Sequence, residues 1–143
     1  MITYLRHHAR GYIISGALPS SQASVAIAAL DVIEQEPELV ATLHANQDHY
    51  LSGLKALGFV TAKSVTAFVP VMTGTTDIAL EMTRLCRAAG LFVIPVCYPA
   101  VPMDAPRLRT CVSAVHTTED IDFALQVLAD AGRQTGLLSN NQV

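Results

Sequence analysis

Gly58 divides this sequence into two parts whose apolar residues repeat with different periods. Before it, residues 23–57 carry apolar side chains at roughly helical spacing, with an interruption at Pro37. Proline breaks or kinks a helix, and glycine commonly stands just past a helix end. After Gly58 the pattern alternates between strand and helix. The sequence therefore predicts a long broken helix over 19–58, followed by a small domain over 59–143.

The part after Gly58 predicts an α+β fold, with a mixed sheet of about three strands and helices over one face. Segments 67–74, 91–99 and 107–114 read as strands, and Pro95 indicates a bulge or an edge position in the second of them. Two helices are expected, over 76–90 and from a cap at Thr117 or Thr118 to about Gly132.

Composition and charge exclude several classes of protein. The net charge is -3 and the pI is about 5.9, which makes nucleic acid a poor partner. No uninterrupted apolar run approaches the roughly 18 residues that a membrane span needs, so we expect no integral membrane segment. Three cysteines without a paired spacing favour reduced thiols and a cytoplasmic location, and Cys97 and Cys111 are expected in the core.

The chain is also unusually apolar. Hydrophobic residues make up 51% of it, charged residues 15%, and the mean hydropathy is +0.38. Such a composition indicates that part of the surface packs against another polypeptide.

An arginine pair is the main candidate for binding chemistry. Arg107 and Arg109 are two residues apart on a predicted strand, so both side chains leave the same face and can converge on an anion. The planar guanidinium matches a carboxylate in geometry, which an ammonium does not. The alternative is that one or both pair with an aspartate of this chain: Asp104, Asp120 or Asp122.

Two further polar residues have a functional and a structural interpretation. His116 precedes a helix cap, where it acts as a general base or simply satisfies loop backbone groups. Ser15 precedes Gly16 and a helix start, where a hydroxyl and backbone N–H groups can hold a phosphate, or where a serine merely caps a turn. His7 and His8 point apart on a helix, so no metal site is predicted.

Four segments together resemble the C-terminal part of the α-oxoamine synthases. They are "YIISGALP", "LKALGF", "AGLFVIPVCYPAVP" and "RLRTCVSAVHTTEDID", and the block from Tyr98 to Asp122 is the most specific. These pyridoxal 5'-phosphate (PLP) enzymes condense an amino acid with an acyl-CoA and release CO2. Members include 8-amino-7-oxononanoate synthase, 2-amino-3-ketobutyrate CoA ligase, 5-aminolevulinate synthase and serine palmitoyltransferase.

The resemblance implies the small C-terminal domain of the fold-type I PLP-enzyme architecture, in a homodimer. It implies that Arg109 holds the carboxylate of the amino-acid substrate and that Arg107 and His116 support it. Ser15 would contact the cofactor phosphate of the neighbouring subunit, and residues 1–18 would end the large domain.

The family's Schiff-base lysine, its aspartate at the pyridine nitrogen and its ring-stacking histidine have no counterpart in this sequence. Lys55 and Lys63 lack the motif of that lysine, so we expect no catalytic residue in this chain and no activity of the chain alone. A free-standing module that binds small carboxylates, or a scaffold that associates through its apolar face, are the alternatives.

Overall fold

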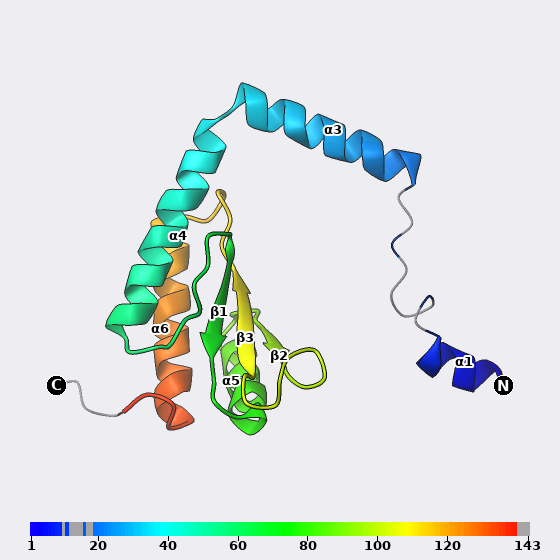
Figure 1. Ribbon diagram of the computed structural model, residues 1–143. Coiled ribbons are helices and arrows are strands. Elements are labelled where there is room, and N and C mark those ends of the chain that lie inside the picture. The colour runs from blue at the N-terminus through cyan, green and yellow to red at the C-terminus, as the bar shows by residue number, and fades with distance from the viewer. Residues whose placement is uncertain (10, 12–15, 17–18, 140–143) are drawn as a thin grey trace. The chain divides into compact units, whose positions relative to one another are not determined.

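The computed structural model describes residues 1–9, 11, 16 and 19–139 (Figure 1). The chain forms two compact units that divide after Pro37. The sequence-based division at residues 18 and 58 stays a prediction.

The first unit contains α1 (Ile2–His8) and α3 (Ser20–Gln35), and neither helix buries a residue. The second unit begins with α4 (Glu38–Ala56). The segment expected as a long broken helix contains α3 and α4, which are separate helices on either side of Pro37, a residue without the backbone N–H that helix continuation needs. Among the described residues, no helix is both long and apolar enough to span a membrane.

The second unit is an α+β domain, which confirms the predicted fold class. After α4 it contains β1 (Phe68–Met72), α5 (Thr76–Ala88), β2 (Ile94–Val96), β3 (Arg107–Cys111) and α6 (Thr118–Gln134). The strand order is β1-β3-β2, and β3 is antiparallel to both neighbours. The sheet is therefore antiparallel rather than mixed, because β3 separates the two strands that run in the same direction.

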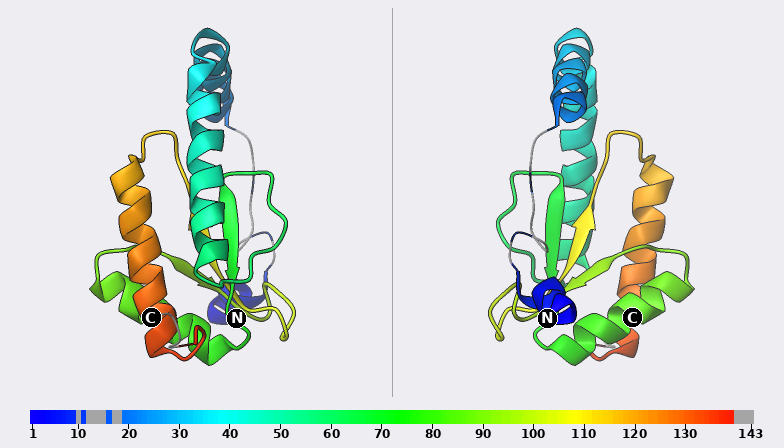
Figure 2. Two further views of the ribbon diagram at one scale, coloured as in Figure 1. Left: turned by 90° about the vertical axis from the view of Figure 1, so that its left-hand side faces the viewer. Right: turned by 90° about the vertical axis from the view of Figure 1, so that its right-hand side faces the viewer.

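Helices α5 and α6 lie on one side of the sheet, as expected, and Figure 2 shows only loops of this unit on the other side. The side chains that face the helices form the core, and Val69, Val71 and Leu108 are fully buried. We call the opposite side the open face. It carries the alternate residues of each strand: Phe68, Pro70 and Met72 of β1, Ile94 and Val96 of β2, and Arg107, Arg109 and Cys111 of β3.

Strand alternation also corrects the prediction for the cysteines. Cys111 is exposed and Cys97 is only partly buried, whereas Cys86 of α5 is the buried thiol. Cys111 shares the open face with Arg109, because residues two apart on a strand leave the same face. The apolar character of the segment misled the prediction, since period-2 alternation decides burial here.

The local signals for helix α6 were reliable. Thr117 is its N-cap: the Thr117 hydroxyl accepts a hydrogen bond from the backbone N–H of Asp120, and the Asp120 carboxylate accepts one from the N–H of Thr117. The helix ends at Gln134, two residues beyond the expected Gly132.

Helices α4 and α6 approach closely at Gly53. A Cβ atom at this position would lie inside the van der Waals radius of the buried Leu125 side chain. His49 of α4 and Asp122 of α6 add an exposed ion pair across the same interface, with 2.7 Å between the imidazole Nε2 and a carboxylate oxygen. The absence of a side chain at Gly53 therefore sets how closely the two helices pack.

We predict that Gly53→Val lowers the free energy of unfolding by about 1–3 kcal/mol, because the new side chain overlaps Leu125. Ser52→Val, one residue earlier on an exposed position of the same helix, is the control and should change stability by less than about 1 kcal/mol. Urea unfolding followed by circular dichroism measures both. Equal effects of the two variants would show that the close contact between α4 and α6 does not limit the size of the side chain at residue 53.

Candidate functional site

The arginine pair lies on the open face of the sheet, as the sequence predicted. Arg109 lies between Pro70 of β1 and Ile94 of β2. Arg107, two residues earlier on β3, lies between Met72 and Val96 of the same neighbouring strands. Arg109 is exposed and Arg107 is partly buried. Because β3 is the central strand, its neighbours fix the direction in which both side chains leave the sheet.

The guanidinium of Arg109 is held by an aromatic ring. Its Cζ lies 4.4 Å from the ring centre of Phe68, a cation–π contact between side chains of adjacent strands. Stacking uses the face of the guanidinium and leaves its N–H edge available for an anion.

No carboxylate of the described residues lies within 4.0 Å of either arginine. The alternative of an internal salt bridge therefore finds no support in this part of the chain. Asp122 pairs with His49, and Asp120 caps α6.

Arg107 has a structural partner. Its Nε donates a hydrogen bond to the carbonyl oxygen of Ala105, at 3.0 Å. This bond ties the side chain to the loop that leads into β3. Arg107 is therefore less available to a ligand than Arg109.

His116 lies in a turn whose backbone it helps to satisfy. Its Nδ1 accepts a hydrogen bond from the N–H of Ser113 at 3.2 Å, so in this arrangement the ring proton is on Nε2. The side-chain amide of Asn46 donates to the carbonyl oxygens of Ser113, at 3.1 Å, and of His116, at 2.9 Å. These bonds anchor the turn to α4, which agrees with the structural interpretation of His116.

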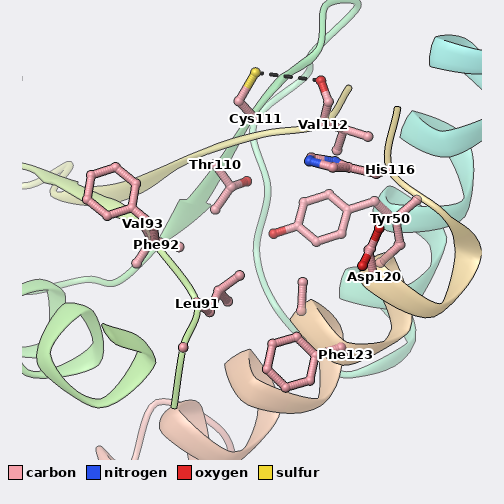
Figure 3. Close-up of a pocket in the computed structure, with 13 residues that line it drawn as sticks. Tyr50, Leu91, Phe92, Val93, Thr110, Cys111, Val112, His116, Asp120 and Phe123 are labelled. Atoms are coloured by element: carbon pink, nitrogen blue, oxygen red, sulfur yellow. Dashed lines mark hydrogen bonds between the residues drawn. The ribbon is translucent and has the colours of Figure 1, made fainter. Parts of the chain in front are cut away.

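His116 also lines a pocket of about 450 Å³ to which neither arginine contributes (Figure 3). The pocket is bounded by α4, the segment that precedes β2, the end of β3 and the first turns of α6. Its lining residues are Tyr50, Gly90, Leu91, Phe92, Val93, Thr110, Cys111, Val112, His116, Asp120, Ile121, Phe123 and Ala124.

Tyr50 is the pocket residue that the sequence analysis missed. Its spacing within residues 23–57 indicated only a helix, and the structure shows that 4% of Tyr50 is exposed. Burial raises the pKa of the Tyr50 hydroxyl to about 12, and a side-chain hydrogen bond with Thr110 offsets part of the rise.

Comparison with known proteins identifies the family. The profile of the aminotransferase class I and II family matches residues 1–128. The chain belongs to this family. Within it, the chain corresponds to the C-terminal part of the α-oxoamine synthases, which confirms the resemblance seen in the sequence.

Two relatives illustrate the match. The 8-amino-7-oxononanoate synthase of Thermoanaerobacter pseudethanolicus is 36% identical over 96% of this chain and 35% of its own length. The serine palmitoyltransferase of Bacteriovorax stolpii is 35% identical over 91% of this chain and 31% of its own length. The chain thus spans about a third of the length of these family members.

Solved structures of family members have the same fold. A serine palmitoyltransferase from S. paucimobilis, with a bound PLP–myriocin aldimine, superposes with a TM-score of 0.77 at 29% identity, covering 95% of this chain and 35% of that one. An 8-amino-7-oxononanoate synthase from Francisella tularensis superposes with a TM-score of 0.67 at 20% identity, covering 93% of this chain and 39% of that one.

Both lysines, Lys55 at the end of α4 and Lys63 in the loop before β1, are exposed. Ser15, the expected contact of the cofactor phosphate, lies outside the described residues.

The raised pKa of Tyr50 predicts that stability falls at high pH. The unfolded hydroxyl ionises near pH 10, whereas the folded one stays protonated to about pH 12. The contribution of Tyr50 is therefore fully present below pH 10 and is lost between pH 10 and 12, by up to about 1.4 kcal/mol per pH unit. Tyr50→Phe should remove this part of the loss.

Urea unfolding of both proteins at pH 9 and pH 11 measures the difference. Cys86, whose thiol pKa burial raises to about 11, is present in both proteins and serves as a common background. Parallel loss of stability in the two proteins would show that the Tyr50 hydroxyl ionises as freely in the folded state as in the unfolded one.

Proposed function

We propose that this chain is the C-terminal portion of a PLP-dependent α-oxoamine synthase, which condenses an amino acid with an acyl-CoA and releases CO2. The observation that carries the proposal is Arg109, an exposed guanidinium without a carboxylate partner among the described residues, on a domain that matches this family. The proposal includes a homodimer in the cytoplasm.

Arg109 holds the carboxylate of the amino acid in this proposal. A guanidinium edge gives two parallel hydrogen bonds to a carboxylate, so it fixes orientation as well as position. Phe68 keeps the guanidinium in place through its ring face. Arg107 supports the site by holding the loop at Ala105, and His116 supports it by ordering the turn after β3.

The remaining parts of the site come from outside the described residues. Ser15 contacts the cofactor phosphate of the neighbouring subunit in this proposal. In this proposal the anchoring lysine belongs to the part of the relatives that this chain does not match, because neither Lys55 nor Lys63 has the sequence motif of that lysine. The chain alone is then inactive.

We predict that the purified chain, incubated with PLP and reduced with borohydride, carries no stoichiometric label on Lys55 or Lys63. It should also release no CoA from an acyl-CoA in the presence of glycine, alanine or serine. Peptide mass mapping and chromatography of CoA measure the two properties. Selective labelling of one lysine, with a spectral shift on addition of an amino acid, would contradict the assignment of the anchor to another segment.

The role of Arg109 is measurable on this chain directly. N-acetylalanine, which has a carboxylate, should shift the side-chain Nε–H resonance of Arg109 in NMR titrations, and N-acetylalaninamide should not. Arg109→Lys, followed through the backbone amides of β3, should weaken binding of the carboxylate by about tenfold or more, because the paired hydrogen bonds are lost.

Two matched variants test the arrangement around Arg109. Arg107→Lys should change the affinity for N-acetylalanine by less than about threefold, since Arg107 is bonded to Ala105. Phe68→Leu should weaken binding by about two- to fivefold, because it removes the cation–π contact. If Arg107→Lys has the larger effect, the carboxylate site is assigned to the wrong arginine. Tight binding without PLP would favour a free-standing carboxylate-binding module.

A further inference from the structure

The pocket beside α6 lies where β2 ends its pairing with β3. Part of its lining comes from residues 91–93, just before β2, and part from residues 110–112, at the end of β3 (Figure 3). Pairing between β2 and β3 starts at Ile94 with Arg109, whereas β1 pairs with β3 as far as Cys111. Among the described residues, the edge of β3 at Cys111 therefore has no strand beside it.

The ladder fixes the direction of the Cys111 backbone. The N–H of Val112 donates to the carbonyl oxygen of Ala67 at 2.9 Å, and the N–H of Thr73 donates to that of Pro106 at 3.1 Å. Even-numbered residues of this segment thus bond toward β1. Successive residues of a central antiparallel strand bond to alternate neighbours, so the N–H and C=O of Cys111 point toward the β2 side. The structure gives neither group a hydrogen bond with another described residue.

This open stretch of edge is one residue long. On one side of it, Arg109 pairs with Ile94 of β2. On the other side, the N–H of Ser113 donates to Nδ1 of His116 at 3.2 Å, and its carbonyl oxygen accepts from the side-chain amide of Asn46 at 3.1 Å. An added peptide strand needs several successive unpaired residues, which this edge does not offer. A small molecule needs only one donor and one acceptor side by side.

The rest of the lining suits an apolar ligand body. The walls are mainly apolar, with contributions from Leu91, Val93, Ile121 and Ala124. A volume of about 450 Å³ lies within the range of pockets that hold small organic molecules. The side chain of Cys111 lies on the open face of the sheet, so its backbone is the part of this residue that a ligand in the pocket can reach.

The charged groups of the lining do not favour a charged ligand. Asp120 is its carboxylate, and that carboxylate accepts the N–H of Thr117 at 2.9 Å. Among the described residues, no lysine or arginine belongs to the lining. An anion would find no counter-charge there, and a cation would find one carboxylate that already caps a helix.

We propose that this pocket binds a small, uncharged heteroaromatic compound that carries a hydrogen-bond acceptor next to an N–H donor. The acceptor bonds the N–H of Cys111 and the donor bonds its carbonyl oxygen, as a paired strand residue would. The apolar walls contribute affinity, and the two backbone groups select this donor–acceptor pattern over an analogue that lacks either half. The site does not depend on the proposed synthase function, because it uses neither arginine.

Three matched probes test the pattern. N-phenylpyrimidin-2-amine has a ring nitrogen beside its N–H and is uncharged at neutral pH. Diphenylamine has the same shape without the acceptor, and N-methyl-N-phenylpyrimidin-2-amine lacks the donor. Each is titrated into the uniformly ¹⁵N-labelled 143-residue chain. The first probe should shift the amide proton of Cys111 downfield, and it should bind about three- to tenfold more tightly than either analogue, because each analogue loses one hydrogen bond.

Three variants, followed through the amides of residues 91–93, complete the test. Cys111→Pro removes the N–H that faces the β2 side, where a strand tolerates proline, and should lower the affinity for N-phenylpyrimidin-2-amine to that for diphenylamine. Cys111→Ala keeps the N–H and should leave all three affinities unchanged. Ala124→Leu should weaken all three probes, because its side chain fills part of the pocket.

Circular dichroism establishes that each variant is folded before titration. The proposal is overturned if no probe shifts the pocket amides, if the three probes bind the natural sequence equally, or if the preference for N-phenylpyrimidin-2-amine persists in Cys111→Pro. The comparison of the three probes on the natural sequence, with the shift of the Cys111 amide, decides the question even if Cys111→Pro does not fold.

Discussion

The position of β3 between β1 and β2 is the constraint on which the second unit depends. Both edges of β3 are hydrogen-bonded, so a shift of register by one residue would turn every side chain to the other face of the sheet. Leu108, which is fully buried against the helices, would then exchange sides with Arg107 and Arg109. The cost of burying two guanidinium groups without partners excludes that register.

The same alternation separates two surfaces with different chemistry. The open face presents Arg109, held by the ring of Phe68, in a position to bind a planar anion. The helix-facing side of the sheet carries Thr110 and Val112, which contribute to an apolar pocket with the Tyr50 hydroxyl. One short strand thus contributes to a candidate carboxylate site and to an apolar pocket, because its successive residues point in opposite directions.

The high apolar content also has a structural counterpart. Helix α3 buries none of its residues, and Val25, Ile27, Leu30 and Ile33 are all more than 40% exposed. The open face adds Phe68 and Ile94, which are exposed as well. In our proposal these surfaces contact the parts of the synthase that the chain does not match and the second subunit of the dimer. Exposed apolar side chains in such number are typical of protein–protein contacts.

Much of the local structure could be predicted from the sequence, because its signals are local. Pro37 ends a helix, and Thr117 and Asp120 form a capping box. Residues two apart on β3 share a face, so the position of Arg107 and Arg109 on the same side of the sheet followed directly. Long-range facts could not be obtained in this way. The antiparallel order β1-β3-β2, the close contact at Gly53 and the contact between Arg109 and Phe68 all involve residues of different elements.

The sequence by itself determined the helices, the strands, the family resemblance and the choice of Arg109 as the candidate ligand for a carboxylate. Only the tertiary structure decided that Arg109 stacks on Phe68 rather than pairing with a nearby aspartate, and that Tyr50 points its hydroxyl into a pocket. The physical reason is that periodicity and capping depend on neighbouring residues. Ring stacking and pocket shape depend on which strand lies beside which, and on how closely the helices pack against them.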